Sequence, residues 1–186
     1  MHLPCYALTK FADPEDRNQD CTGSATVPHS IGADLSVEGA LRRHVETLAA
    51  TPRNLEHYRA LQHAEAYIAA QFSAAGYAPS RHEFEAVGRR IANIEAERPG
   101  TTRPDRTIAI GSHYDSIGFS PGANDNASGV AALLELARLH ALSRPGDSTV
   151  RFVAFVNEEP PYFMTDTMGA SCMREGWPRD ANRSPE

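Results

Sequence analysis

Apolar residues recur at helical spacing in three stretches of the chain. In the first, which starts near Ser36, they recur every three or four residues to about position 48. The second runs over residues 55–75 and ends at Gly76, a residue typical of helix C-termini. In the third, residues 127–142, valine, leucine and alanine recur at i, i+3, i+4 and i+7. The pattern therefore predicts three helices, the last of them well buried.

Four shorter segments have the character of β-strands. Residues 81–87 alternate weakly between apolar and polar, and residues 91–96 alternate better. Residues 107–111 and 149–156 are apolar runs, which predict strands buried on both faces. Because the third helix lies between these two runs with short connections, they predict a right-handed βαβ unit on a parallel sheet.

The two ends of the chain show no sustained period. Residues 1–34 are rich in Asp, Asn, Thr, Gly and Pro and are predicted to form an irregular N-terminal arm. Periodicity is lost again after Met168, so residues 169–186 are expected to be an atypical tail, and we hypothesise a frameshift or an incomplete gene. The compact domain is expected to span residues 35–168.

Composition excludes several classes of protein. Hydrophobic residues make up 41% of the chain, enough for a core, and a net charge of −6 argues against nucleic acid as a partner. No stretch approaches the roughly 20 apolar residues of a membrane span. Three cysteines without a Cys-x-x-Cys pair, and no secretory signal, lead us to expect a cytoplasmic protein. His44, His57 and His63 lack a second ligand at i+4 and are expected to be exposed.

Five side chains with catalytic chemistry lie at the ends of the predicted βαβ strands. His113 and Asp115 follow the first strand, Glu158 and Glu159 follow the second, and Asp125 precedes the helix between them. The carboxyl ends of parallel strands meet at one edge of a sheet, where α/β proteins place their ligands. We therefore expect these residues to converge.

Each of these side chains has a role available in a zinc site that activates water. His113 can bind through one ring nitrogen while Asp115 accepts the N–H of the other. Asp125 can bridge two ions about 3.5–4 Å apart. Of Glu158 and Glu159, one can bind metal while its neighbour acts as the general base. Taken singly, the three segments could be a buried ion pair, a helix N-cap and an acidic turn. Their occurrence together at one edge favours a metal site.

Three runs, GSHYDS at 111–116, PGANDNASG at 121–129 and FVNEEPP at 155–161, resemble the di-zinc aminopeptidases of metallopeptidase family 28. The resemblance covers about residues 55–168. It implies an α/β fold, a three-layer αβα sandwich with a mixed, mainly parallel sheet, here incomplete. It also implies a peptide substrate and two zinc ions, although cobalt or manganese could substitute.

The resemblance also assigns a role to each candidate residue. It implies that His113 binds one zinc ion, Glu159 binds the other, and Asp125 bridges both. Glu158 would be the general base, and Asp115 would orient His113. Most family members remove N-terminal residues from peptides, while some relatives are carboxypeptidases or glutaminyl cyclases.

Two ligands that family members supply downstream, a carboxylate and a histidine, have no counterpart here. Asp180 and Glu186 do not follow a strand and are discounted. Each zinc ion would then keep two protein ligands, whereas a catalytic zinc normally has three. We therefore expect weak or absent zinc binding and poor solubility for the chain as written. The alternatives to an aminopeptidase are a glutaminyl-cyclase-like acyltransferase with one zinc, a non-catalytic binding domain and a pseudogene product.

Overall fold

Four strands and four α-helices make up residues 36–174, the part of the chain described by this computed structural model. The predicted N-terminal arm and residues 175–186 of the predicted tail lie outside this part. Within it, no helix combines the length and apolar content that crossing a membrane requires. In chain order the elements are α1 (Val37–Leu48), α2 (Tyr58–Ala74), β1 (Ser80–Ala86), β2 (Arg89–Arg98), β3 (Arg103–His113), the π-helical turn η1 (Ala123–Ala127), α3 (Ser128–Leu142), β4 (Ser148–Phe155) and α4 (Gly169–Arg174).

The four strands form one mixed sheet in the order β1-β2-β4-β3. β3 and β4 are parallel, which confirms the pairing predicted for the βαβ unit. β1 and β2 are antiparallel, as are β2 and β4, so the described part of the sheet is less parallel than predicted. A tight turn joins β1 to β2, and both of its central residues, Val87 and Gly88, have positive φ. That geometry matches the twist of a two-residue hairpin and makes these strands antiparallel neighbours.

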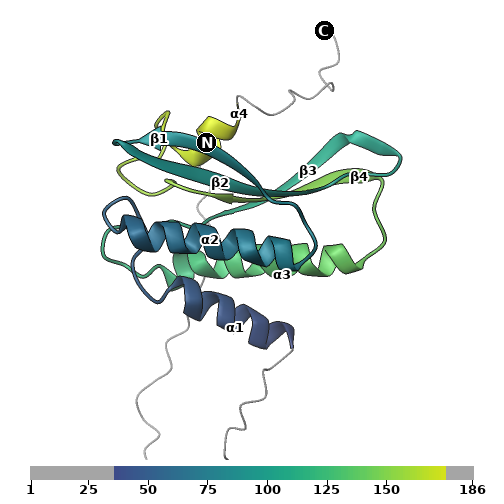
Figure 1. The fold of residues 1–186 in the computed structure, drawn as a ribbon, viewed down its shortest axis with the longest axis horizontal. Helices are drawn as coiled ribbons and strands as arrows, with labels where there is room; N and C mark the ends of the chain where they lie inside the picture. The colour runs from purple at the N-terminus through teal and green to yellow at the C-terminus, as the bar shows by residue number, and fades with distance from the viewer. Residues whose placement is uncertain (1–35, 175–186) are drawn as a thin grey trace, which may run out of the picture. The chain divides into compact units, whose positions relative to one another are not determined.

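Helices cover both faces of the sheet, as the three-layer prediction requires. Figure 1 shows α2 and α3 against one face, α1 outside them, and the short α4 on the opposite face. α2 places Leu61, Ile68 and Phe72 in the core, on the face predicted from their spacing. Gly76 follows α2 with φ of +94°, a conformation that glycine adopts without strain.

The prediction that residues 107–111 are buried on both faces is wrong. β3 lies at the edge of the sheet, and Ile108 is 48% exposed. The equivalent prediction for β4 is confirmed at Phe152, Val153 and Ala154, which are almost fully buried. Both segments are apolar runs, and only strand order distinguishes the interior strand from the edge strand.

His44 was expected to be exposed, but it is buried between α1, α2 and α3. Its Nδ1 lies 2.7 Å from the hydroxyl of Tyr67 and its Nε2 lies 3.4 Å from Glu135. His44 shares the buried face of α1 with Ala40 and Leu48, four residues before and after it. His57 is also only half-exposed, whereas His63 is exposed as expected.

The buried His44 predicts a pH dependence of stability. Burial lowers its pKa below the ordinary value of 6.5, and the hydrogen bond and charge of Glu135 offset only part of that effect. The unfolded chain therefore binds a proton at higher pH than the folded chain, so the free energy of unfolding falls as the pH drops below 6.5. Urea unfolding between about pH 7.5 and 5.5 should show a smaller fall for His44→Gln than for the wild type. Equal falls in the two proteins would contradict this assignment.

The N-terminus of α1 is capped by Ser36, at the position where the helix was predicted to start. Its hydroxyl accepts a hydrogen bond of 3.0 Å from the amide of Gly39. We expect Ser36→Ala to lower the free energy of unfolding by about 1 kcal/mol, since one amide of the first turn loses its partner. Urea unfolding measures this, with Ser73→Ala, at an exposed position of α2, as the matched control. A loss no larger than that of the control would exclude a capping role.

The first residues of the predicted tail pack against the sheet. Asn93 on β2 donates to the carbonyl of Gly169 at 2.8 Å and accepts from the amide of Val156 at 3.0 Å. A Cβ atom on Gly169 would lie only 2.4 Å from Asn93, so this close approach requires glycine. Met173 is 5% exposed. These contacts hold both ends of the loop between β4 and α4 close to the sheet.

Candidate metal centre

The segments that carry the candidate residues meet at one edge of the sheet. His113 is the last residue of β3, and the parallel register places it opposite Phe155, the last residue of β4. Glu158 and Glu159 follow β4, and Asp125 lies in the η1 turn before α3. The convergence expected from the βαβ order is therefore observed.

His113, Asp125 and Glu159 form a cluster in which one ligand atom from each lies within 4.8 Å of the other two. Nε2 of His113 is 3.0 Å from Oδ1 of Asp125. Two ligands at about 2.0–2.1 Å from a tetrahedral zinc ion would be about 3.3 Å apart, so this pair fits with little movement. Three donors are also the number that a catalytic zinc ion takes from protein. The sequence-based count of two ligands per ion assumed two ions, whereas this geometry offers three ligands to one.

Asp115 connects the two ligand segments. It is 3% exposed, and its Oδ2 accepts a hydrogen bond of 3.2 Å from the amide of Glu159. Its Oδ1 lies 3.5 Å from Nδ1 of His113, on the ring nitrogen that faces away from Asp125. Burial opposes protonation of His113, but the nearby carboxylate of Asp115, with the charges of Asp125 and Glu159, raises its pKa. The histidine is thus surrounded by carboxylates on both sides.

Several polar atoms of this cluster and of Asp115 are buried without a hydrogen-bond partner. Among the described residues they include Nδ1 of His113, Oδ1 of Asp115 and Oε1 of Glu159. Such atoms are rare in folded proteins because an unpaired buried polar group lowers stability by about 1–3 kcal/mol. A cation bound between the carboxylates would compensate the oxygen of Glu159. The donor set of one imidazole and carboxylates suits zinc.

The two adjacent glutamates have different surroundings. Glu159 belongs to the ligand cluster, whereas Oε1 of Glu158 accepts a hydrogen bond of 2.7 Å from the amide of Ala170 in α4. Burial raises the pKa of both carboxyls. For Glu158 the charge of Asp115 adds to this effect, and the bond from Ala170 opposes it. The geometry therefore places Glu159 within the ligand cluster and Glu158 outside it, a distinction that residue type and spacing left open and that the resemblance alone implied.

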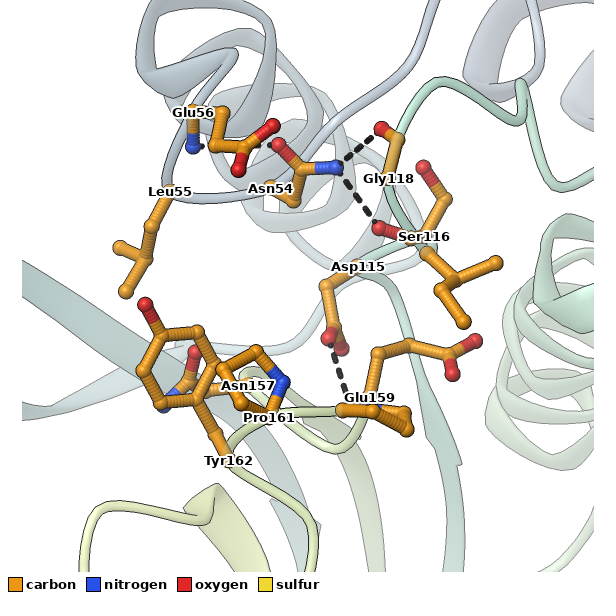
Figure 2. A pocket seen from close by; sticks show the side chains of 12 residues that line it. Asn54, Leu55, Glu56, Asp115, Ser116, Gly118, Asn157, Glu159, Pro161 and Tyr162 are labelled. Carbon is orange, nitrogen blue, oxygen red and sulfur yellow. Dashed lines mark hydrogen bonds between the residues drawn. The ribbon is translucent and has the colours of Figure 1, made fainter.

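A cavity of about 220 Å³ lies beside the cluster. Figure 2 shows Asp115 and Glu159 on one side of it, with Leu55 and Tyr162 on the other. Its lining comes from three segments: residues 54–56, residues 115–118, and Asn157 with residues 159–162. No motif pointed to the first of these segments.

Asn54 was missed by the sequence analysis and shapes this cavity. Its side-chain amide donates to the carbonyls of Ser116 at 2.9 Å and Gly118 at 2.6 Å. Figure 2 shows both bonds at the rim of the cavity. They fix the loop after β3 to the segment before α2. An asparagine in a turn is common, so the sequence held no signal of this role.

The fold is that of the zinc exopeptidases and their structural relatives. An aminopeptidase from Aneurinibacillus sp. strain AM-1 superposes with a TM-score of 0.64 at 16% identity, covering 78% of this chain and 67% of that chain. A glutaminyl cyclase from Macrostomum lignano has the same TM-score at 24% identity, covering 88% and 54%. At these identities the likeness establishes the fold alone.

The sequence comparison identifies the family. Residues 93–172 match Peptidase family M28, and this part of the chain belongs to that family. The match includes all five candidate residues and extends into α4. YfbL from Escherichia coli (strain K12) is 38% identical over 128 residues, which cover 64% of this chain and 39% of YfbL. The aminopeptidase YwaD from Bacillus subtilis (strain 168) is 44% identical over 66 residues, 36% of this chain and 14% of YwaD. The chain thus spans about two fifths or less of these two relatives.

Proposed function

We propose that this chain binds zinc through His113, Asp125 and Glu159 and serves a metal-dependent aminopeptidase reaction on peptides. The observation that carries the proposal is the convergence of these three donors within 4.8 Å, with unpaired buried atoms in the same cluster. Kinship to Peptidase family M28, and a relative named as an aminopeptidase, support the reaction class.

Bound zinc supplies a Lewis acid that polarises a carbonyl and lowers the pKa of water. Asp115 holds His113 in the orientation needed for binding, as carboxylates behind metal-ligating histidines do. Glu158 is the general base. Its Oε1 is occupied by the amide of Ala170, so Oε2 is the oxygen free to take a proton and return it to the leaving amine.

The charge of the site favours substrates with a free amino terminus. The site holds four carboxylates, those of Asp115, Asp125, Glu158 and Glu159. Their combined negative charge exceeds the positive charge of a single zinc ion, so an ammonium group is attracted and a carboxylate is repelled. The neighbouring cavity is smaller than the roughly 300–1,000 Å³ of sites for drug-sized ligands. It would hold one substrate side chain against Leu55 and Tyr162.

Two measurements test the proposal. Isothermal titration of the metal-free chain with zinc should give a saturable binding event, against the weak or absent binding expected from ligand counting. The zinc-loaded chain should then release the first residue from a leucine-initiated peptide but not from its N-acetylated form. Binding without release would refute the hydrolytic part for this chain, and no binding would refute both parts. Ammonia from an N-terminal glutamine, without cleavage, would favour a glutaminyl-cyclase-like reaction.

A further inference from the structure

Arg53 is buried in the segment between α1 and α2, and backbone carbonyls surround its guanidinium. The side chain is among the largest fully buried ones, and the residue is 1% exposed. It donates to the carbonyls of Tyr114 at 2.6 Å, Leu48 at 3.0 Å and Gly122 at 3.0 Å, and also to the carbonyl of Pro121. A buried charge is tolerated only where its hydrogen bonds are satisfied, and these four carbonyls satisfy it.

The backbone of Arg53 binds the same loop. Its amide donates to the hydroxyl of Ser116 at 3.1 Å, and its carbonyl accepts from the amide of Ser116 at 2.9 Å. The bonded loop, residues 114–122, is the connection between His113 on β3 and the turn that carries Asp125. Arg53 therefore contacts this connection near its start, at Tyr114 and Ser116, and at its end, at Pro121 and Gly122.

The charge of Arg53 also acts on the carboxylates. Asp115 is the charged group that opposes the effect of burial on the Arg53 pKa, so the two attract each other. Before any metal binds, the carboxylates at this edge of the sheet repel one another. The fixed positive charge of Arg53 reduces that repulsion through its attraction to Asp115.

We propose that Arg53 is a positioning residue for the metal centre, which holds the loop of residues 114–122 so that His113 and Asp125 face the same ion. This inference rests on the proposed zinc site. Lysine cannot take over the role, because an ammonium group is a compact point donor whereas guanidinium offers five N–H groups in a planar fork. Only the planar guanidinium can donate to four carbonyls that are spread around one side chain.

The test compares Arg53→Lys with the wild type in the full chain. Arg59→Lys, an equivalent change at an exposed position of α2, is the matched control. Zinc affinity is measured by competition with a chromophoric chelator under conditions where circular dichroism shows each protein to be folded. We expect Arg53→Lys to bind zinc about 10–100-fold more weakly, the range found when supporting residues of metal sites are changed. Arg59→Lys should match the wild type.

The visible spectrum of bound cobalt separates positioning from a purely structural role. Cobalt reports ligand geometry, so Arg53→Lys should shift or weaken the absorption bands while the control leaves them unchanged. Equal zinc affinity and identical cobalt spectra in Arg53→Lys and the wild type would overturn the inference. Absence of zinc binding by the wild type would refute the proposed function itself.

A milder variant covers the outcome in which Arg53→Lys does not fold. Ser116→Ala removes the hydroxyl that binds the Arg53 amide but leaves the guanidinium and its four carbonyls in place. We expect this variant to fold and to bind zinc several-fold more weakly than the wild type. Wild-type affinity in Ser116→Ala, together with an unfolded Arg53→Lys, would mean that Arg53 serves folding alone and would overturn the inference.

Discussion

Glu158→Gln is expected to lower the rate of peptide hydrolysis by about 10²–10⁴-fold, the contribution typical of a positioned general base. Glutamine keeps the size of the side chain and an oxygen that can accept from the amide of Ala170. It cannot take up a proton, so the loss should appear in kcat. Zinc affinity should stay within a few-fold of the wild type, because Glu158 lies outside the ligand cluster.

The neighbouring Glu159→Gln is the matched control for this prediction. It makes the same chemical change one residue away, at a side chain that belongs to the cluster. We expect it to weaken zinc binding, with activity partly restored at high zinc concentration. The assignment of the two glutamates would be reversed if Glu158→Gln lost zinc and Glu159→Gln kept it.

His113→Ala is expected to weaken zinc binding by about 100-fold or more, since it removes a ligand and not merely its support. His113 is the cluster's sole imidazole donor, and its Nε2 already lies 3.0 Å from Asp125. Isothermal titration measures the affinity. The change also leaves Asp115 without the ring that it faces.

His63→Ala is the control for this loss, because His63 is exposed on α2. It should bind zinc like the wild type and unfold at a similar urea concentration. If both variants bound zinc equally well, the metal would occupy some other position. The cluster of His113, Asp125 and Glu159 would then have to be abandoned as the zinc site.

Periodicity along the chain was enough to place most of the secondary structure. Helical and alternating patterns report which side of an element faces the core, and this information is local. The βαβ order then implied that His113 and Glu159 meet at one edge, since parallel strands end on the same side. The candidate residues therefore followed from the order of elements and from residue type.

Strand order and long-range contacts were decided only in the folded molecule. Residues 107–111 form an edge strand, although the run is as apolar as that of β4. His44 is buried because partners on α2 and α3 reach it, and nothing within α1 encodes those partners.

At the site itself, spacing brought both glutamates to the metal centre but did not distinguish them. The separation arises because an amide of α4 binds Glu158, while Glu159 lies beside His113. Arg53 carried no motif, since three of its four carbonyl partners, those of Tyr114, Pro121 and Gly122, come from backbone positions far from it in sequence. Local patterns thus determined which residue types reach this edge of the sheet. Packing between distant segments decided what each of them contacts.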